Sequence, residues 1–438
     1  MPYEVDRSLL QRITDPLIRQ GVEMAISRTL LPALTERAYP GHFTVTANGK
    51  GYGEWNSWPG LDSWEMAGAY LHLGMNRVVE DYYDYVEASQ RADGNVPFAI
   101  FTAAEIRKQV EDIGYSHARW PEDAFVYDDP QGNSREWVGL YEHWVKTNPL
   151  STLAPICHIL LGAEIHAASS SLSWLAAHVG SMERAGAYLL TQKSPEGFIG
   201  GAGFYVELPS RWAWDGITQC YSVEAFRRLA GLYDLLGRPA DRDRWLGQAR
   251  ELTERFRAVF WTGRHFAEYL HPTHGAVDLR KLTDVDMAAI AFDLALPDQS
   301  ALVWKQIQTE ASFWHGDMPT RLTTLPFAYE PWELIDEFPP GLEDWEPTRD
   351  ASGIGRIWFV DMLASLKRGD GARVVDAVRK VCRRGEQDGW LWYERYKSLP
   401  DGTAESIGPA GYCEYAAILV RIVLGNLELF SDEPKEAP

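Results

Sequence analysis

The sequence predicts an all-α protein, an (α/α)6 toroid in which paired helices form a ring with long aromatic loops on one rim. Amphipathic helical segments recur in pairs along the 438 residues. The loops between them alternate between short and long, and strand patterns are few. An α-solenoid of stacked helix pairs is the alternative, but such proteins usually repeat at a fixed sequence period, which this chain does not show. We therefore expect a single (α/α)6 domain over residues 1–438.

The individual elements follow from apolar periodicity and from Gly and Pro signals. A first helix over about 9–31 is interrupted by Pro16. Short β-hairpins are expected at 264–270 and 390–396, and irregular loops at 46–60, 107–132 and 313–354. The remaining predicted helices cover roughly 61–74, 76–90, 135–147, 151–166, 170–191, 217–236, 240–260, 284–296, 299–312, 355–367, 371–383 and 409–425.

Composition limits the function classes. The chain carries 62 acidic and 42 basic residues, a formal net charge of -20, which opposes binding of nucleic acids or anionic membranes and suits a small neutral ligand. The N-terminal segment has no apolar signal and no apolar run approaches membrane-spanning length, so we expect a cytoplasmic protein. The cysteines, Cys157, Cys220, Cys382 and Cys413, lie far apart and form no CxxC pair, so neither a zinc site nor a disulfide framework is predicted. No cofactor is expected. The oligomeric state is left open.

Aromatic residues in the predicted loops indicate a carbohydrate ligand. The chain has 18 tryptophans, many of which fill helical cores. Trp55, Trp58, Trp214, Trp345 and Trp390 instead stand beside Gly, Pro, Asp or Asn in loops. Aromatic faces in a loop-lined cleft stack on sugar rings while carboxylates and amides bind the hydroxyls.

Asp215 is the candidate general acid. It lies between Trp214 and Gly216 at the start of a helix. An apolar environment would raise the carboxyl pKa toward the range of a general acid, and the glycine would allow close approach of another group. The alternative is that Asp215 only caps the following helix.

Glu394 is the candidate general base, because hydrolytic toroids use two carboxylates on opposite faces of the sugar. It lies in an aromatic stretch, GWLWYERY. It could also be an exposed strand residue paired with Arg395 or Lys397. Glu405 and Glu414 are the competing candidates for the base.

These segments resemble the glycoside hydrolase clan of trehalases, processing α-glucosidase I and bacterial mannosylglycerate and glucosylglycerate hydrolases. Trp214-Asp215 is similar to the segment that carries the clan's general acid, and Glu394-Arg395-Tyr396 to the segment that carries its base. The sequence WNSWPGLDSW resembles the clan's substrate-site segment, which would place Asp62 on sugar hydroxyls.

Two further segments resemble the clan, and two positions depart from its pattern. The turn ADGNVP would bring Gln90 and Asn95 near the site, and GIGRIWF keeps Arg356 and Trp358 of a longer clan motif. Leu61 stands where a tryptophan is expected, and the segment 412–415 replaces an aromatic and hydroxyl pattern, which bears on the substrate rather than on the reaction.

The resemblance implies inverting, metal-free hydrolysis of a small α-linked hexoside. Asp215 would protonate the leaving oxygen and Glu394 would activate water, with the two carboxyl groups about 6.5–9.5 Å apart. Residues expected to contact the substrate are Trp55, Trp58, Asp62, Trp64, Gln90, Asn95, Arg211, Trp212, Trp214, Gln219, Arg356, Trp358, Trp390, Trp392, Tyr393, Tyr396 and Tyr412.

Several alternatives remain open. A sugar isomerase or 2-epimerase on the same toroid would need a histidine pair on inner helices, and a noncatalytic sugar-binding toroid would need only the aromatic residues. For a hydrolase, a glycerate aglycone would require a cation such as Arg211 or Arg356, whereas a neutral disaccharide would not. Glucose and mannose are not distinguished.

Overall fold

A computed structural model describes residues 5, 7–49, 55–103, 124–141, 152–200, 214–310, 318, 330–333, 352–398 and 404–431. Helices dominate this part of the chain, as predicted, and three small sheets accompany them. Among the described residues, no helix combines the length and apolar character needed to cross a membrane.

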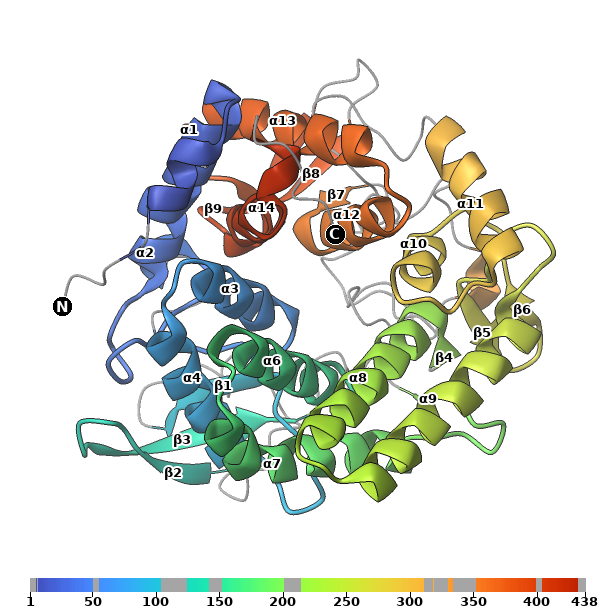
Figure 1. The fold of residues 1–438 in the computed structure, drawn as a ribbon, viewed down its shortest axis with the longest axis horizontal. Helices are drawn as coiled ribbons and strands as arrows, with labels where there is room; N and C mark the ends of the chain where they lie inside the picture. Colours follow the sequence, from blue (N-terminus) through green and yellow to red (C-terminus); the bar gives the residue numbers. More distant parts are fainter. Residues whose placement is uncertain are drawn as a thin grey trace.

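One set of helices forms a closed inner ring. Each packs against the next along the chain, and the last packs against the first (Figure 1). The set comprises α3 (Leu61–His72), α6 (Leu153–Ser169), α8 (Gly216–Leu235), α10 (Asp284–Ala291), α12 (Gly355–Lys367) and α14 (Cys413–Gly425). These helices contribute many of the buried apolar residues, and nearly every residue of α14 is buried.

A second set lies outside the ring and packs against it (Figure 1). It comprises α1 (Pro16–Met24), α4 (Asn76–Ala88), α7 (Leu172–Thr191), α9 (Pro239–Phe260), α11 (Pro297–Thr309) and α13 (Gly371–Gln387). A π-helical segment, Ala25–Leu30, continues α1 into the short α2 (Leu31–Ala33). Two concentric sets of helices are consistent with the predicted helical toroid.

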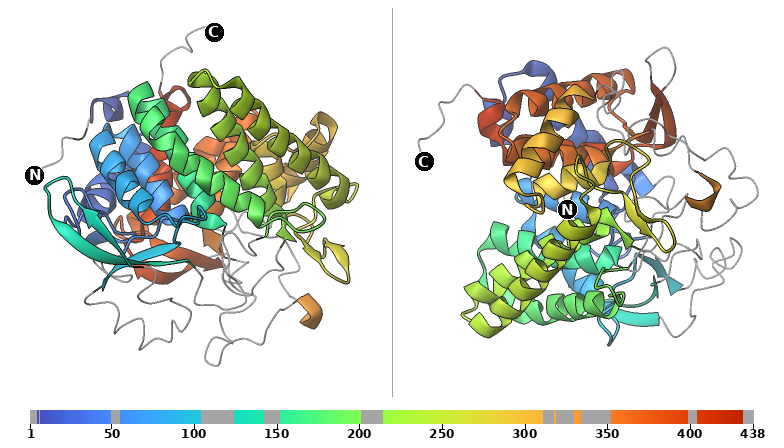
Figure 2. Two further views of the ribbon diagram at one scale, coloured as in Figure 1. Left: turned by 90° about the horizontal axis from the view of Figure 1, so that it is seen from below. Right: turned by 90° about the vertical axis from the view of Figure 1, so that its right-hand side faces the viewer.

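The strands form three antiparallel sheets, and Figure 2 shows that they gather toward one end of the helices. Strands β4 and β7 lead directly into α8 and α12, so these inner helices begin at the sheet end. The sheets are β1-β3-β2 (Ala99–Thr102, Ser134–Leu140, Ala124–Asp128), β4-β5-β6 (Trp214–Asp215, Tyr269–His271, Gly275–Val277) and β7-β8-β9 (Gly353–Ile354, Tyr393–Ser398, Ala404–Ala410).

Two of the predicted helices and the predicted hairpins need correction. The helix predicted over 135–147 is wrong, because Ser134–Leu140 forms strand β3 and pairs with β1 and β2. The predicted interruption at Pro16 is present, since a 3-10 helix at Ser8–Arg12 ends before it and Pro16 begins α1, at the first-turn position that proline favours. The helix predicted from 409 begins at Cys413, since Ala404–Ala410 forms β9, and the sheets are larger than the predicted hairpins.

Candidate active site

Acidic residues gather where the inner helices begin. Asp62 lies in the first turn of α3 and Glu65 in its second, Asp215 directly precedes α8, Asp286 lies in the first turn of α10, and Glu414 in that of α14. The positive end of a helix dipole stabilises negative charge at these positions. The ring therefore brings together carboxyl groups that are far apart in the sequence.

Asp215 is fully buried and caps α8. Its Oδ1 accepts a hydrogen bond from the backbone N–H of Thr218 at 3.0 Å. The Gln219 side chain donates to the Asp215 carbonyl at 3.0 Å and exchanges hydrogen bonds with the backbone of Ile199, which fixes the entry to the helix. The structure thus confirms that Asp215 caps α8, and its role as a general acid stays a prediction.

The two neighbours of Asp215 have different surroundings. Trp214 lines a hollow of about 580 Å³ with Phe198, His271 and residues of α9. Because successive side chains of a strand point to opposite faces, Asp215 points away from this hollow. A Cβ on Gly216 would lie 2.6 Å from Val285 Cγ1, so the group that approaches this glycine closely is a side chain of α10.

Glu394 lies on β8 where the β8–β9 register shifts between Tyr393 and Arg395. Its side chain is 14% exposed, and its Oε1 is 3.6 Å from Arg395 Nε. Gly408 on β9 faces it: a Cβ there would lie 2.5 Å from Glu394 Oε2. Glu405, on the same strand as Gly408, is exposed.

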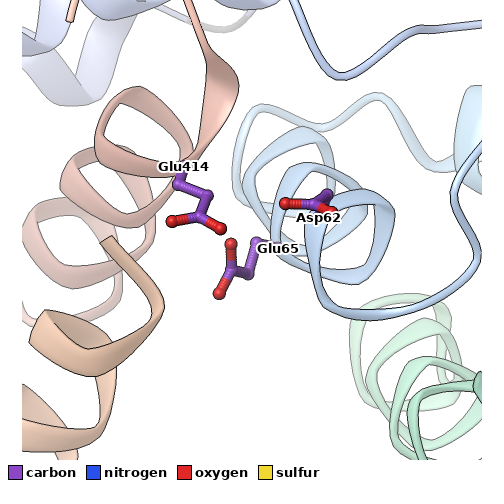
Figure 3. A group of neighbouring side chains, drawn as sticks. All are labelled: Asp62, Glu65 and Glu414. Carbon is purple, nitrogen blue, oxygen red and sulfur yellow. The ribbon is translucent and has the colours of Figure 1, made fainter. Parts of the chain in front are cut away.

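Asp62, Glu65 and Glu414 form a cluster between α3 and α14, here called the acidic cluster (Figure 3). One carboxylate oxygen of each lies within 4.8 Å of the others. Arg356 of α12 donates from Nε to Glu414 at 2.5 Å and from Nη2 to Asp62 at 3.0 Å. The Tyr412 hydroxyl donates to Asp62 at 2.5 Å. The sequence-predicted residues Asp62, Arg356 and Tyr412 therefore lie together.

Burial and neighbouring charges shift the pKa values of the residues in and around this cluster. Burial, opposed by Arg356 and reinforced by Asp62, raises the pKa of Glu414 to about 8. Burial and the neighbouring Glu414 raise the pKa of Glu65 well above its usual value. Burial alone would lower the pKa of Arg356, but the adjacent carboxylates raise it. A Cβ on Gly355 would lie 2.6 Å from Glu414 Cβ, so α12 and α14 pack tightly beside the cluster.

The aromatic residues around Glu394 are mainly buried in the protein. Trp392 is fully buried and donates to the Val381 carbonyl at 2.9 Å, while Tyr396 donates to Asp388 at 2.7 Å and accepts from the backbone N–H of Tyr393. Trp390 is 7% exposed and adopts a φ of 66°, and Trp358 is fully buried. The structure gives these residues a packing role, and their contact with substrate stays a prediction.

The remaining predicted residues occupy the α3 and α4 side of the ring. Trp58 packs on Phe98 and Phe101, and the Trp64 indole donates to Glu164 at 3.0 Å. The other placements are as follows: Trp55 lies beneath Arg37 and Arg135, Gln90 donates to the Gly94 and Ser181 carbonyls, and Asn95 is buried. Arg211, Trp212 and Trp345 lie outside the described residues.

The sequence analysis missed two features of this end of the ring. Glu65 follows Asp62 by three residues, a spacing that puts both on one helix face, and this was the available signal. Arg280 is fully buried between Glu268 and Glu333, with contacts of 2.5 Å to each. Tyr269 also donates to Glu333 at 2.5 Å. The partners come from segments too far apart for a local pattern to reveal.

Comparison with known proteins identifies the fold. No protein-family model matches the chain, and no curated protein matches it in sequence. A GH63 mannosylglycerate hydrolase from Thermus thermophilus superposes with a TM-score of 0.60 at 11% identity, over 93% of this chain and 99% of that one. A GH78 family rhamnosidase of Bacillus sp. GL1 gives 0.58 at 14% identity, over 95% and 35%. A rhamnosidase from Klebsiella oxytoca gives 0.57 at 11%, over 97% and 66%. The chain thus spans about a third and about two thirds of the two rhamnosidases, and these likenesses show a shared fold.

Proposed function

We propose that the chain is an inverting glycoside hydrolase on an (α/α)6 toroid that cleaves a small α-linked hexoside. Asp215 protonates the leaving oxygen and Glu394 activates the water on the opposite face of the sugar. The observation that carries the proposal is the buried Asp215 at the start of an inner helix, on a fold similar to that of a GH63 mannosylglycerate hydrolase.

The environments of the three candidate bases favour Glu394. A general base must be ionised at the working pH. The pKa of Glu414 is raised to about 8 by burial, and this residue is bonded to Arg356, so it is poorly suited to accept a proton from water near pH 7. Glu405 is exposed, whereas Glu394 is partly enclosed and lies beside a glycine that leaves room at its carboxylate.

The contacts of Arg356 favour a neutral aglycone over glycerate. Arginine recognises carboxylates through its N–H fork, but two sides of the Arg356 fork already contact Glu414 and Asp62. An anionic aglycone would also meet the acidic cluster. Arg211, the other candidate cation, lies outside the described residues, so it is on the contacts of Arg356 alone that we propose a substrate recognised through its hydroxyl groups.

The isomerase alternative receives little support. His158 lies on inner helix α6, but its Nε2 bonds Tyr83 and Ser181 of the outer helices α4 and α7, at 2.9 Å each. Burial lowers its pKa to about 3, so it remains neutral. A histidine directed toward the outer layer is poorly placed to move a proton on a sugar in the ring.

A substrate screen with stereochemical readout tests the hydrolase. Wild type, Asp215→Asn and Glu394→Gln are incubated with trehalose, kojibiose, glucosylglycerate, mannosylglycerate and nitrophenyl α-hexosides, and proton NMR identifies the first anomer released. Asparagine also caps helices well, so Asp215→Asn should keep the fold. Asp370→Asn, which alters the cap of the outer helix α13, is the matched control.

We expect wild type and Asp370→Asn to release the β-anomer, and both site variants to lose at least a hundredfold in kcat/KM. Activity retained in either site variant would show that its carboxylate is wrongly assigned. On substrates that release a single sugar, the nitrophenyl α-hexosides and the glycosylglycerates, release of the α-anomer would exclude inversion. Inactivity toward every α-hexoside would reject the proposed reaction.

A further inference from the structure

The acidic cluster has more carboxyl groups than its cation can neutralise. Its three carboxylates carry a formal charge of -3, and Arg356 contributes +1. Nearby Arg421 also acts on Glu65, but it contacts none of the three carboxylates and is itself paired with Glu164 at 2.7 Å. With all three carboxyl groups ionised, the cluster would keep a charge near -2 in a largely buried place, which is costly unless protons or another cation offset it.

Glu65 provides a second and separate observation. Its side chain is fully buried, and neither carboxylate oxygen has a hydrogen-bond partner within the described part of the chain. Figure 3 shows its carboxylate directed toward that of Glu414. Asp62 and Glu414 are held by Arg356 and Tyr412, whereas Glu65 has no such contact. Buried polar groups nearly always have a partner, so a missing ligand is indicated here.

The geometry suits one ion among these three side chains. One oxygen from each lies within 4.8 Å of the others, so a single ion can contact all three. Oxygen atoms 2.3–2.6 Å from Ca²⁺ can be separated by up to about 5 Å. The donors are all carboxylate oxygens, the hard ligands that Ca²⁺ accepts in variable number, whereas Mg²⁺ demands a tighter octahedron and retains its water.

We propose that Asp62, Glu65 and Glu414 bind one divalent cation of the Ca²⁺ class between α3 and α14. Its charge balances the two negative charges that Arg356 leaves. The side chains of Asp62 and Arg356 are 17% and 14% exposed, so the cluster opens to solvent on their side. Water or the hydroxyl groups of a ligand complete the coordination there. Asp62 also belongs to the residues expected to contact the substrate, but the test of cation binding needs no substrate, so it can fail without bearing on the proposed hydrolysis.

The experiment measures Ca²⁺ binding to the full chain after treatment with EDTA and dialysis. Isothermal titration calorimetry with CaCl₂ at pH 8 gives the stoichiometry and Kd, and thermal denaturation with and without CaCl₂ gives the change in Tm. MgCl₂ is the comparison salt. The variants are Glu65→Gln and Glu414→Gln, and Asp234→Asn is the control because it removes an exposed carboxylate at the opposite end of α8.

We expect one Ca²⁺ per chain with a Kd below about 1 mM, a higher Tm in its presence, and weaker binding of Mg²⁺. Glu65→Gln and Glu414→Gln should each weaken binding at least tenfold, while Asp234→Asn should bind as wild type does. Absence of saturable binding would overturn the proposal. Equal binding by wild type and Glu65→Gln would overturn it too, because the ion would then occupy other surface carboxylates. If Glu65→Gln does not fold, the Glu414→Gln result decides.

Discussion

Gly408→Ala should displace the carboxylate of Glu394 without removing any functional group. An added Cβ would lie 2.7 Å from Glu394 Cβ and 2.5 Å from Oε2. An ordinary contact is about 3.4 Å or longer, so the side chain must move by nearly 1 Å. A shift of this size in a catalytic group can cost about a hundredfold in rate. We expect kcat/KM to fall by about that factor on the substrate that the screen identifies.

Gly389→Ala is the matched control. Both glycines have positive φ, 86° at Gly408 and 64° at Gly389, so alanine carries a backbone cost of about 1–2 kcal/mol at either position. A Cβ on Gly389 would meet nothing within 4 Å. Thermal denaturation should therefore show similar destabilisation, with activity lost only in Gly408→Ala. Activity within twofold of wild type in Gly408→Ala, or an equal loss in both variants, would refute the reasoning.

Two further predictions concern buried charge. Arg280→Met leaves Glu268 and Glu333 buried without their cation, which should cost about 3–5 kcal/mol, or about 4 °C in Tm for 438 residues. Adding Glu268→Gln and Glu333→Gln should recover much of this loss in thermal denaturation, and no recovery would argue against a charge effect. Burial raises the pKa of Glu414 from 4.5 to about 8, so between these values the folded chain holds a proton that the unfolded chain lacks. In EDTA, the unfolding free energy should fall as pH rises through this interval, and urea titrations of Glu414→Gln should show a smaller fall.

Helices with clear local boundaries were predicted closely from the sequence. The predicted segment 355–367 coincides with α12, and 240–260 differs from α9 by one residue. Both begin next to a glycine or proline and carry a regular apolar pattern, so local signals suffice. Ser134–Leu140 was predicted as helix because its strand character depends on pairing with Ala99–Thr102, which a window along the chain does not reveal.

The site was predictable only in part for the same reason. Asp62 and Asp215 stand at recognisable helix starts, so they could be selected as candidates. The bond between Tyr412 and Asp62 joins residues 350 positions apart, and the one between Arg356 and Asp62 spans 294. Glu65 comes close to Glu414 only because α14 packs against α3, and this contact exists only in the closed ring.

The close packing at Gly216 and Gly355 has a consequence for the width of the ring. Each glycine begins an inner helix, and a side chain of the next inner helix, Val285 or Glu414, occupies the space that a Cβ would need. At the sheet end, the spacing of the inner helices is thus limited at two contacts, α8 with α10 and α12 with α14, by glycines that have no side chain. A methyl group added at either glycine would push the two contacting helices apart and move the carboxylate at the neighbouring helix start. The two glycines therefore limit how far apart the inner helices lie at the sheet end.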